Sequence, residues 1–116
     1  DEILRLAARV LEANCRSIDV SARFGGDEFC VLMPHADPDS TMRVAHRIST
    51  AFDEAVASLK LFETCVSMSI GISHWDISTP VNADELVRHA DVAMYKAKSS
   101  DHSKIILYEC EMREAS

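Results

Sequence analysis

The sequence predicts an α+β fold, a sandwich in which helices pack on one mixed central sheet. Two observations support this prediction. Apolar residues recur at helical spacing in three segments, and they alternate with polar residues in the segments between them. The chain also has 116 residues, of which 47% are hydrophobic, so it is expected to fold as a single domain with a buried core.

The first part of the chain predicts a helix followed by a hairpin. Residues 1–15 carry an apolar stripe with the spacing of a helix. Between residues 20 and 33 the pattern changes to period two, and it is interrupted by Gly25-Gly26-Asp27-Glu28. Because adjacent glycines between two such segments favour a tight turn, we expect a hairpin with Gly-Gly at its tip.

The remainder of the chain predicts two helices and two strands, and capping residues mark the start of each helix. An Asp followed by Pro, or an Asn placed three residues before a Glu, is typical of a helix N-terminus. The expected elements are a helix opened by Asp37-Pro38 and running to residue 59, a strand over residues 65–74, a helix opened by Asn82 and Glu85, and a strand over residues 104–108.

The charge of the chain argues against DNA or RNA as a partner. Nineteen Asp and Glu residues against twelve Lys and Arg give a formal net charge of −7, whereas nucleic-acid-binding proteins carry a basic surface. No apolar run approaches the roughly 18 residues of a membrane span, so this domain is expected to make no membrane contact. Four scattered cysteines are typical of a reducing compartment. We therefore expect a cytoplasmic domain, and leave open membrane attachment of the full-length protein.

The stretch Gly25-Gly26-Asp27-Glu28-Phe29 is the most informative in the chain. Two adjacent glycines allow positive φ and a close approach of the backbone, whose N–H groups can then contact phosphate oxygens. The two carboxylates that follow offer the hard oxygen ligands that Mg²⁺ prefers. The plainer alternative is an ordinary hairpin turn followed by solvated acidic side chains.

Residues 23–29, Arg-Phe-Gly-Gly-Asp-Glu-Phe, resemble the signature of the GGDEF family, the diguanylate cyclases of bacteria. Residues 69–72 and 90–98 resemble later segments of that family in the same order, so the resemblance spans nearly the whole chain. It implies a ferredoxin-like, nucleotidyl-cyclase-like sandwich. It also implies an enzyme, acting as a homodimer, that condenses two GTP molecules into cyclic di-GMP with release of pyrophosphate.

The resemblance further implies roles for individual residues. Asp27 is implied to bind Mg²⁺ or Mn²⁺, and Asp27 and Glu28 to be catalytic. The implied substrate contacts are Gly25 and Gly26 against the nucleotide, Asp1 on guanine and Lys98 on phosphate. Without the resemblance, an acid at position 1 is a first-turn residue favoured by the helix dipole, and the lysine is a solvated side chain near a helix C-terminus.

Arg16 and Asp19 lie three residues apart ahead of the signature, and they match the family's RxxD inhibitory site for the product. Arginine can bind guanine O6 and N7 as a two-pronged donor, and aspartate can accept from the opposite guanine edge. The resemblance therefore implies feedback inhibition by cyclic di-GMP, with Arg47 completing the site. The alternative is a weak exposed ion pair.

The sequence also departs from the family pattern. Family members carry, ahead of these residues, a first strand with a metal-binding aspartate, then a Phe-Lys pair and a guanine-binding asparagine, and none of these is present here. We therefore expect residues 1–116 to be a single GGDEF domain that is N-terminally incomplete. Asp101-His102-Ser103 stands where the family usually has Gly-Arg-Asn, and residues 109–116 resemble an exit linker toward a further domain.

These departures leave a second function open. The intact signature favours an active cyclase. The alternative is a catalytically inactive GGDEF domain that binds GTP or cyclic di-GMP as a regulatory module in a multidomain signalling protein. A third possibility is a structural remnant that folds only when a partner chain supplies the absent strand.

Overall fold

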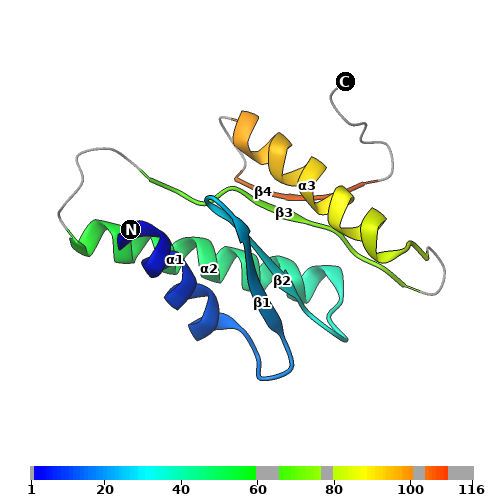
Figure 1. Cartoon of the computed structure of the whole chain (residues 1–116), viewed down its shortest axis with the longest axis horizontal. Helices are drawn as coiled ribbons and strands as arrows, with labels where there is room; N and C mark the ends of the chain where they lie inside the picture. The colour runs from blue at the N-terminus through cyan, green and yellow to red at the C-terminus, as the bar shows by residue number, and fades with distance from the viewer. Residues whose placement is uncertain (1, 60–65, 77–79, 101–103, 110–116) are drawn as a thin grey trace. The chain divides into compact units, whose positions relative to one another are not determined.

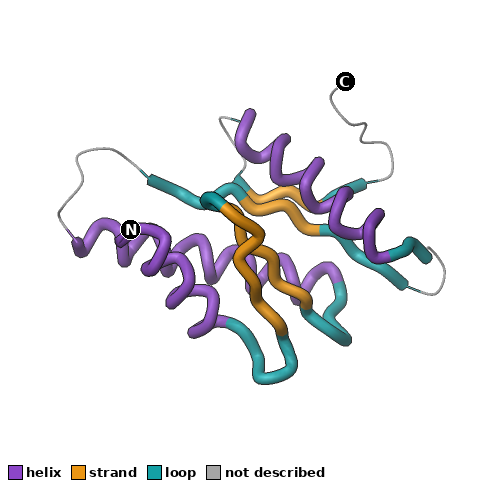
Figure 2. Tube along the Cα trace, in the orientation of Figure 1, coloured by secondary structure: helices purple, strands orange, loops and turns teal. Residues whose placement is uncertain are grey.

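The computed structural model describes residues 2–59, 66–76, 80–100 and 104–109. Its helices and strands follow one another in the predicted order, so the α+β class is confirmed (Figures 1 and 2). The elements are α1 (Glu2–Asn14), β1 (Val20–Gly25), β2 (Glu28–Leu32), α2 (Pro38–Leu59), β3 (Ile70–Ile72), α3 (Ala83–Ser99) and β4 (Ile105–Leu107).

The described strands form two separate two-stranded sheets. β1 pairs with β2 in antiparallel fashion, and β3 pairs with β4 in parallel fashion. This differs from the expected single mixed sheet, although both kinds of pairing are present. The reason is that alternation in a sequence specifies the two faces of a strand, but does not specify which strand becomes its neighbour.

The predicted helix starts are confirmed. The Asp37 carboxylate accepts a hydrogen bond of 2.7 Å from the Ser40 N–H, and this bond lowers the pKa of Asp37. At α3, Asn82 Oδ1 accepts from the Glu85 N–H at 2.8 Å, while Asn82 Nδ2 donates to Glu85 Oε1 at 3.0 Å. Each cap satisfies a backbone N–H that the first helical turn leaves without a partner.

The strand expected over residues 65–74 is shorter than predicted, and its first residue lies outside the described part of the chain. β3 covers Ile70–Ile72, where it pairs with the three residues of β4. The alternating pattern continues on both sides of β3, but a strand ends where its ladder of partners ends.

The described residues group into two compact units. The first contains α1, the β1–β2 hairpin and the part of α2 from residue 46 onward; its buried residues are Leu6, Ala7, Val10, Leu11, Ile48 and Phe52. The second contains residues 37–45 together with β3, α3 and β4; its buried residues are Ala45, Ile72, Ala93, Ala97 and Ile105.

In the second unit, small residues bring α3 directly against β3. Ala93 and Ala97 are fully buried on α3. A Cβ placed on Gly71 of β3 would lie 2.1 Å from the Ala90 carbonyl oxygen and 2.2 Å from the Met94 nitrogen. The backbone of the helix therefore occupies the space that any side chain at position 71 would need.

Contacts just beyond the C-terminal ends of the two strands add to this packing. The Ser73 hydroxyl donates to the Leu86 carbonyl of α3, and the Tyr108 N–H donates to the Ile72 carbonyl at 2.7 Å. The ring of His89 stacks on Tyr108 with centroids 4.0 Å apart and planes 1° from parallel.

The helices in the described part of the chain include none with the length and apolar character that a membrane span requires.

We predict that Gly71→Ala destabilises the fold, because the added methyl group must push the α3 backbone away from β3. The free energy of unfolding is expected to fall by about 2–3 kcal/mol, as measured by urea denaturation. Ser67→Ala, at an exposed position in the same segment, serves as the control and should change it little. A Gly71→Ala variant as stable as the control would contradict the close packing of α3 on β3.

Candidate active site

The acidic signature forms the turn at the end of the β1–β2 hairpin. The ladder pairs Arg23 with Phe29 and then Gly25 with Glu28, so Phe24 is an extra residue that bulges from β1. Gly26 and Asp27 form the turn itself. The Gly-Gly tip predicted from the sequence is therefore confirmed in kind, but Gly25 is the last residue of β1.

Both glycines adopt backbone conformations that side chains disfavour. The φ angle is 134° at Gly25 and 54° at Gly26. Apart from the glycine itself and its two neighbours in the chain, no atom of the described residues lies within 4 Å of the place that a Cβ would occupy at either position. Glycine is thus required here by conformation and not by crowding, and the backbone of the turn stays open to solvent and to a ligand.

Asp27 and Glu28 are both exposed at this turn. Among the residues that the structure describes, no three His, Cys, Asp or Glu side chains gather as a complete metal cluster. Mg²⁺ nevertheless needs only one or two protein carboxylates when phosphates and water complete its octahedron. Two adjacent carboxylates beside an open backbone therefore fit a Mg²⁺ or Mn²⁺ ion that is shared with a phosphorylated substrate.

Arg23 closes the turn from the side of β1. Its Nε donates to the Gly26 carbonyl oxygen at 2.9 Å, and its Nη2 donates to the same oxygen. Arg23 belongs to the signature at residues 23–29, but the sequence pattern alone assigns it no role. Its position three residues before Gly26 is the signal that could have suggested a contact across the turn.

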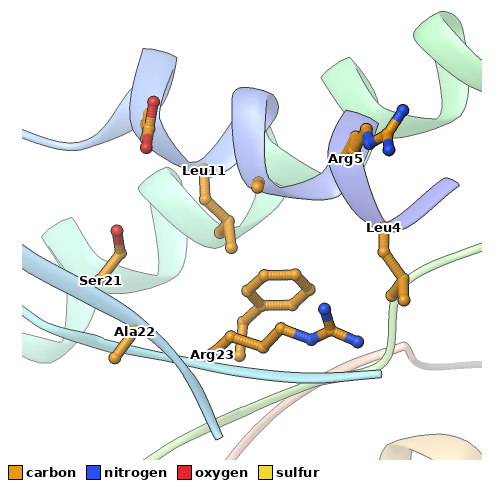
Figure 3. A pocket seen from close by; sticks show the side chains of 9 residues that line it. Leu4, Arg5, Leu11, Ser21, Ala22 and Arg23 are labelled. Carbon is orange, nitrogen blue, oxygen red and sulfur yellow. The ribbon is translucent and has the colours of Figure 1, made fainter. Parts of the chain in front are cut away.

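A hollow of about 510 Å³ lies beside the turn, between α1 and the hairpin. Figure 3 shows Leu4 and Leu11 pointing from α1 toward Arg23, and Phe29 adds an aromatic ring to the lining. Arg5 and Glu12 contribute charged groups at its edge. The hollow is open on one side, and its lining combines apolar side chains with the charged groups of Arg5, Glu12 and Arg23.

A second group of predicted residues meets at the C-terminal end of α1. Arg16 Nη2 lies 2.7 Å from Asp19 Oδ1, and the Arg16 backbone N–H donates to Asp19 Oδ2 at 2.7 Å. Arg16 Nη2 also donates to the Pro34 carbonyl at 2.6 Å. The Asp19 side chain is covered (0% exposed), whereas the Arg16 side chain is 44% exposed. Both carboxylate oxygens of Asp19 are therefore occupied by Arg16.

Arg47 of α2 is tied to the same end of α1. Its Nε donates to Asn14 Oδ1 at 2.9 Å and its Nη2 to the Asn14 carbonyl at 3.1 Å. Cys15 lies next to Arg16 in the chain. Burial and the charge of Asp19 raise the pKa of its thiol, while the charge of Arg47 lowers it. Arg16 and Asp19 thus pair with each other just beyond the end of α1, and Arg47 binds the last residue of that helix.

Two other residues, Asp1 and Lys98, were also predicted to contact the substrate. Asp1 lies outside the described residues. Lys98 is exposed in the last turn of α3, in the second unit. The proposed roles of Asp1 on guanine and Lys98 on phosphate therefore stay predictions.

Comparison with known proteins gives one family match and several relatives. The family described as "Diguanylate cyclase, GGDEF domain" matches residues 1–104. "Diguanylate cyclase A" of Treponema denticola is 28% identical over 115 residues, which are 99% of this chain and 31% of that protein. "Diguanylate cyclase DgcM" of Escherichia coli (strain K12) is 31% identical over 107 residues, which are 91% of this chain and 25% of that protein.

A third relative, "Uncharacterized protein YtrP" of Bacillus subtilis (strain 168), is 34% identical over 109 residues. The match covers 94% of this chain and 18% of that protein. The chain therefore spans less than a third of the length of these relatives.

The Arg16–Asp19 pair predicts a specific titration behaviour. Hydrogen bonds from the Arg16 side chain hold the pKa of Asp19 below its ordinary value. A group whose pKa is lower in the folded chain stabilises the fold above its ordinary pKa of about 4, and this contribution is lost as the pH falls through the lowered value. Arg16→Ala should therefore raise the pKa of Asp19 toward the ordinary value, as measured by carboxyl ¹³C NMR titration.

Arg43→Ala is the matched control for this titration, because Arg43 bonds locally to Ser40 and should leave Asp19 unaffected. A titration of Asp19 that is the same in Arg16→Ala and in the wild type would contradict the pairing.

Proposed function

Because the chain belongs to the GGDEF family of diguanylate cyclases, we propose that it condenses two GTP molecules into cyclic di-GMP and releases pyrophosphate. The observation that carries this proposal is the intact acidic turn, in which two positive-φ glycines present Asp27 and Glu28 beside an open backbone. In keeping with the family, we propose a ferredoxin-like GGDEF domain that uses GTP in the cytoplasm, within a longer signalling protein.

The reaction forms two phosphodiester bonds. In each, the 3′-hydroxyl of one GTP attacks the α-phosphorus of the other, the bond to the pyrophosphate group breaks, and the hydroxyl proton leaves to a base. Asp27 would hold Mg²⁺ or Mn²⁺, which supplies neutralisation of the charge that develops on the phosphate oxygens. Asp27 would also be the candidate base for the hydroxyl proton, with the neighbouring Glu28 carboxylate as the second acid of the site. Backbone N–H groups of the turn could approach phosphate oxygens, because Gly25 and Gly26 carry no side chain and the space at their Cβ positions is open.

The product explains why two copies are needed. One chain carries one acidic turn, and cyclic di-GMP contains two equivalent nucleotides. A symmetric homodimer would bring one GTP from each protomer into mutual attack. In this arrangement Asp1 would bind the guanine amino and N1–H donors, and Lys98 would bind phosphate.

We expect Asp27→Asn to reduce the rate of cyclic di-GMP formation by about 100-fold or more, because an amide is a poor ligand for Mg²⁺. Turnover is measured by chromatography and mass spectrometry of the product from GTP. Folding should be unchanged, since the side chain is exposed. Asp53→Asn, at an exposed position on α2, is the control. Undiminished turnover in Asp27→Asn would refute the proposed role of Asp27.

We also propose that Arg16, Asp19 and Arg47 bind cyclic di-GMP as a feedback inhibitor. Three charged residues converge at the end of α1, and Arg16 remains partly exposed there. Because the Asp19 oxygens are occupied by Arg16, recognition of guanine by Asp19 would require this pair to open. Arg16 would then be able to present its guanidinium to guanine O6 and N7.

This site predicts that Arg16→Ala and Arg47→Ala each weaken cyclic di-GMP binding by about tenfold or more, since each removes a two-pronged donor. Titration calorimetry measures the affinity. Arg43→Ala is again the control, because it removes an arginine of α2 that lies outside this group. Unchanged affinity in both variants would remove the proposed product site.

The alternative is a GGDEF domain that binds GTP or cyclic di-GMP without turnover. The substitution of Asp101-His102-Ser103 for the usual Gly-Arg-Asn favours this alternative. A folded dimer that binds cyclic di-GMP but forms none from GTP and Mg²⁺ would establish it in place of the cyclase.

A further inference from the structure

We propose that Arg23 is a positioning residue, which fixes the peptide between Gly26 and Asp27 and thereby orients the Asp27 carboxylate. The inference deepens the proposed cyclase function and rests on it. Arg23 would act through the backbone of the turn, without touching the substrate itself.

The contact pattern of Arg23 supports this role. Its Nε and Nη2 both donate to one acceptor, the Gly26 carbonyl oxygen. The guanidinium group is rigid and charged, and it places two N–H donors on the same oxygen. It therefore fixes the direction of the carbonyl more closely than a single flexible donor would. The strand ladder cannot do this here, because the bulge at Phe24 shifts the register between Arg23 and Gly25.

The geometry of a peptide carries the effect to Asp27. In a planar trans peptide, the carbonyl of Gly26 and the N–H of Asp27 point in opposite directions. While Arg23 holds the carbonyl on its own side, the Asp27 N–H faces the other side of the turn. Glycines at positions 25 and 26, with φ of 134° and 54°, otherwise leave this peptide wide rotational freedom. Arg23 therefore supplies the order that the glycines do not.

Arg23 also lines the hollow beside the turn (Figure 3). A direct contact with a substrate phosphate is thus the competing role for this residue. The two roles differ in what a substitution changes. Loss of a positioning residue misplaces Asp27 and lowers kcat, whereas loss of a phosphate contact weakens GTP binding and raises KM.

The first test observes the turn directly, in the complete protein that carries this chain. Selective ¹⁵N labelling of glycine and aspartate reports the order parameters of the Gly26 and Asp27 amides. Arg23→Ala should lower both, Arg23→Lys should lower them less, and Arg43→Ala should leave them unchanged. Arg43 is a matched control because its Nη2 also bonds locally, to Ser40 Oγ at 3.0 Å. An equally ordered turn in Arg23→Ala would overturn the proposal.

The second test is kinetic. Arg23→Ala should lower kcat for cyclic di-GMP formation by about 10-fold to 100-fold, with KM for GTP changed less than about threefold, and Arg23→Lys should recover part of kcat. A raised KM with unchanged kcat would instead assign Arg23 to phosphate binding. If the wild-type protein forms no cyclic di-GMP, the proposed function fails, while the order of the turn still decides the role of Arg23.

Discussion

Two consecutive positive φ angles, at Gly25 and Gly26, constrain the whole of the candidate site. They let β1 turn into β2 within two residues, and they place Asp27 and Glu28 at the exposed end of the hairpin. The same freedom that makes the turn possible would leave it poorly ordered. The Arg23 guanidinium counters this with two donors on one carbonyl oxygen. The chemistry proposed for the carboxylates thus depends on two opposing effects. Gly25 and Gly26 give the backbone of the turn its conformational freedom, and the hydrogen bonds from Arg23 to the Gly26 carbonyl restrict it.

The sequence predicted the features that depend on neighbouring residues. The caps at Asp37 and Asn82, the hairpin and the order of the elements follow from local side-chain chemistry and from periodicity, and the structure has them as expected. The signature also identified Asp27 and Glu28 as a pair, because adjacent residues need no folding to be brought together.

The features that depend on tertiary neighbours were not predictable in this way. The alternating pattern gave no information on which strands pair. One sheet was expected, whereas the strands in the described part of the chain form two. The RxxD spacing left open whether Arg16 and Asp19 bind the product or pair with each other. The structure pairs them and covers the Asp19 side chain, which the sequence pattern had suggested would be exposed. The contact of Arg47 with Asn14 joins residues 33 apart in the sequence, and no local signal reports it.

The close fit of α3 on β3 also bears on how the chain can vary. Backbone atoms of Ala90 and Met94 fill the space beside Gly71, and Ala93 and Ala97 are sealed in the same unit. Larger residues at such positions would have to move the helix, whereas Val87 and Tyr95 on the exposed side of α3 can change without that cost. Tolerance to mutation along α3 is therefore expected to follow the helical period of about 3.6 residues. Buried positions should resist substitution, and changes should accumulate at the exposed positions.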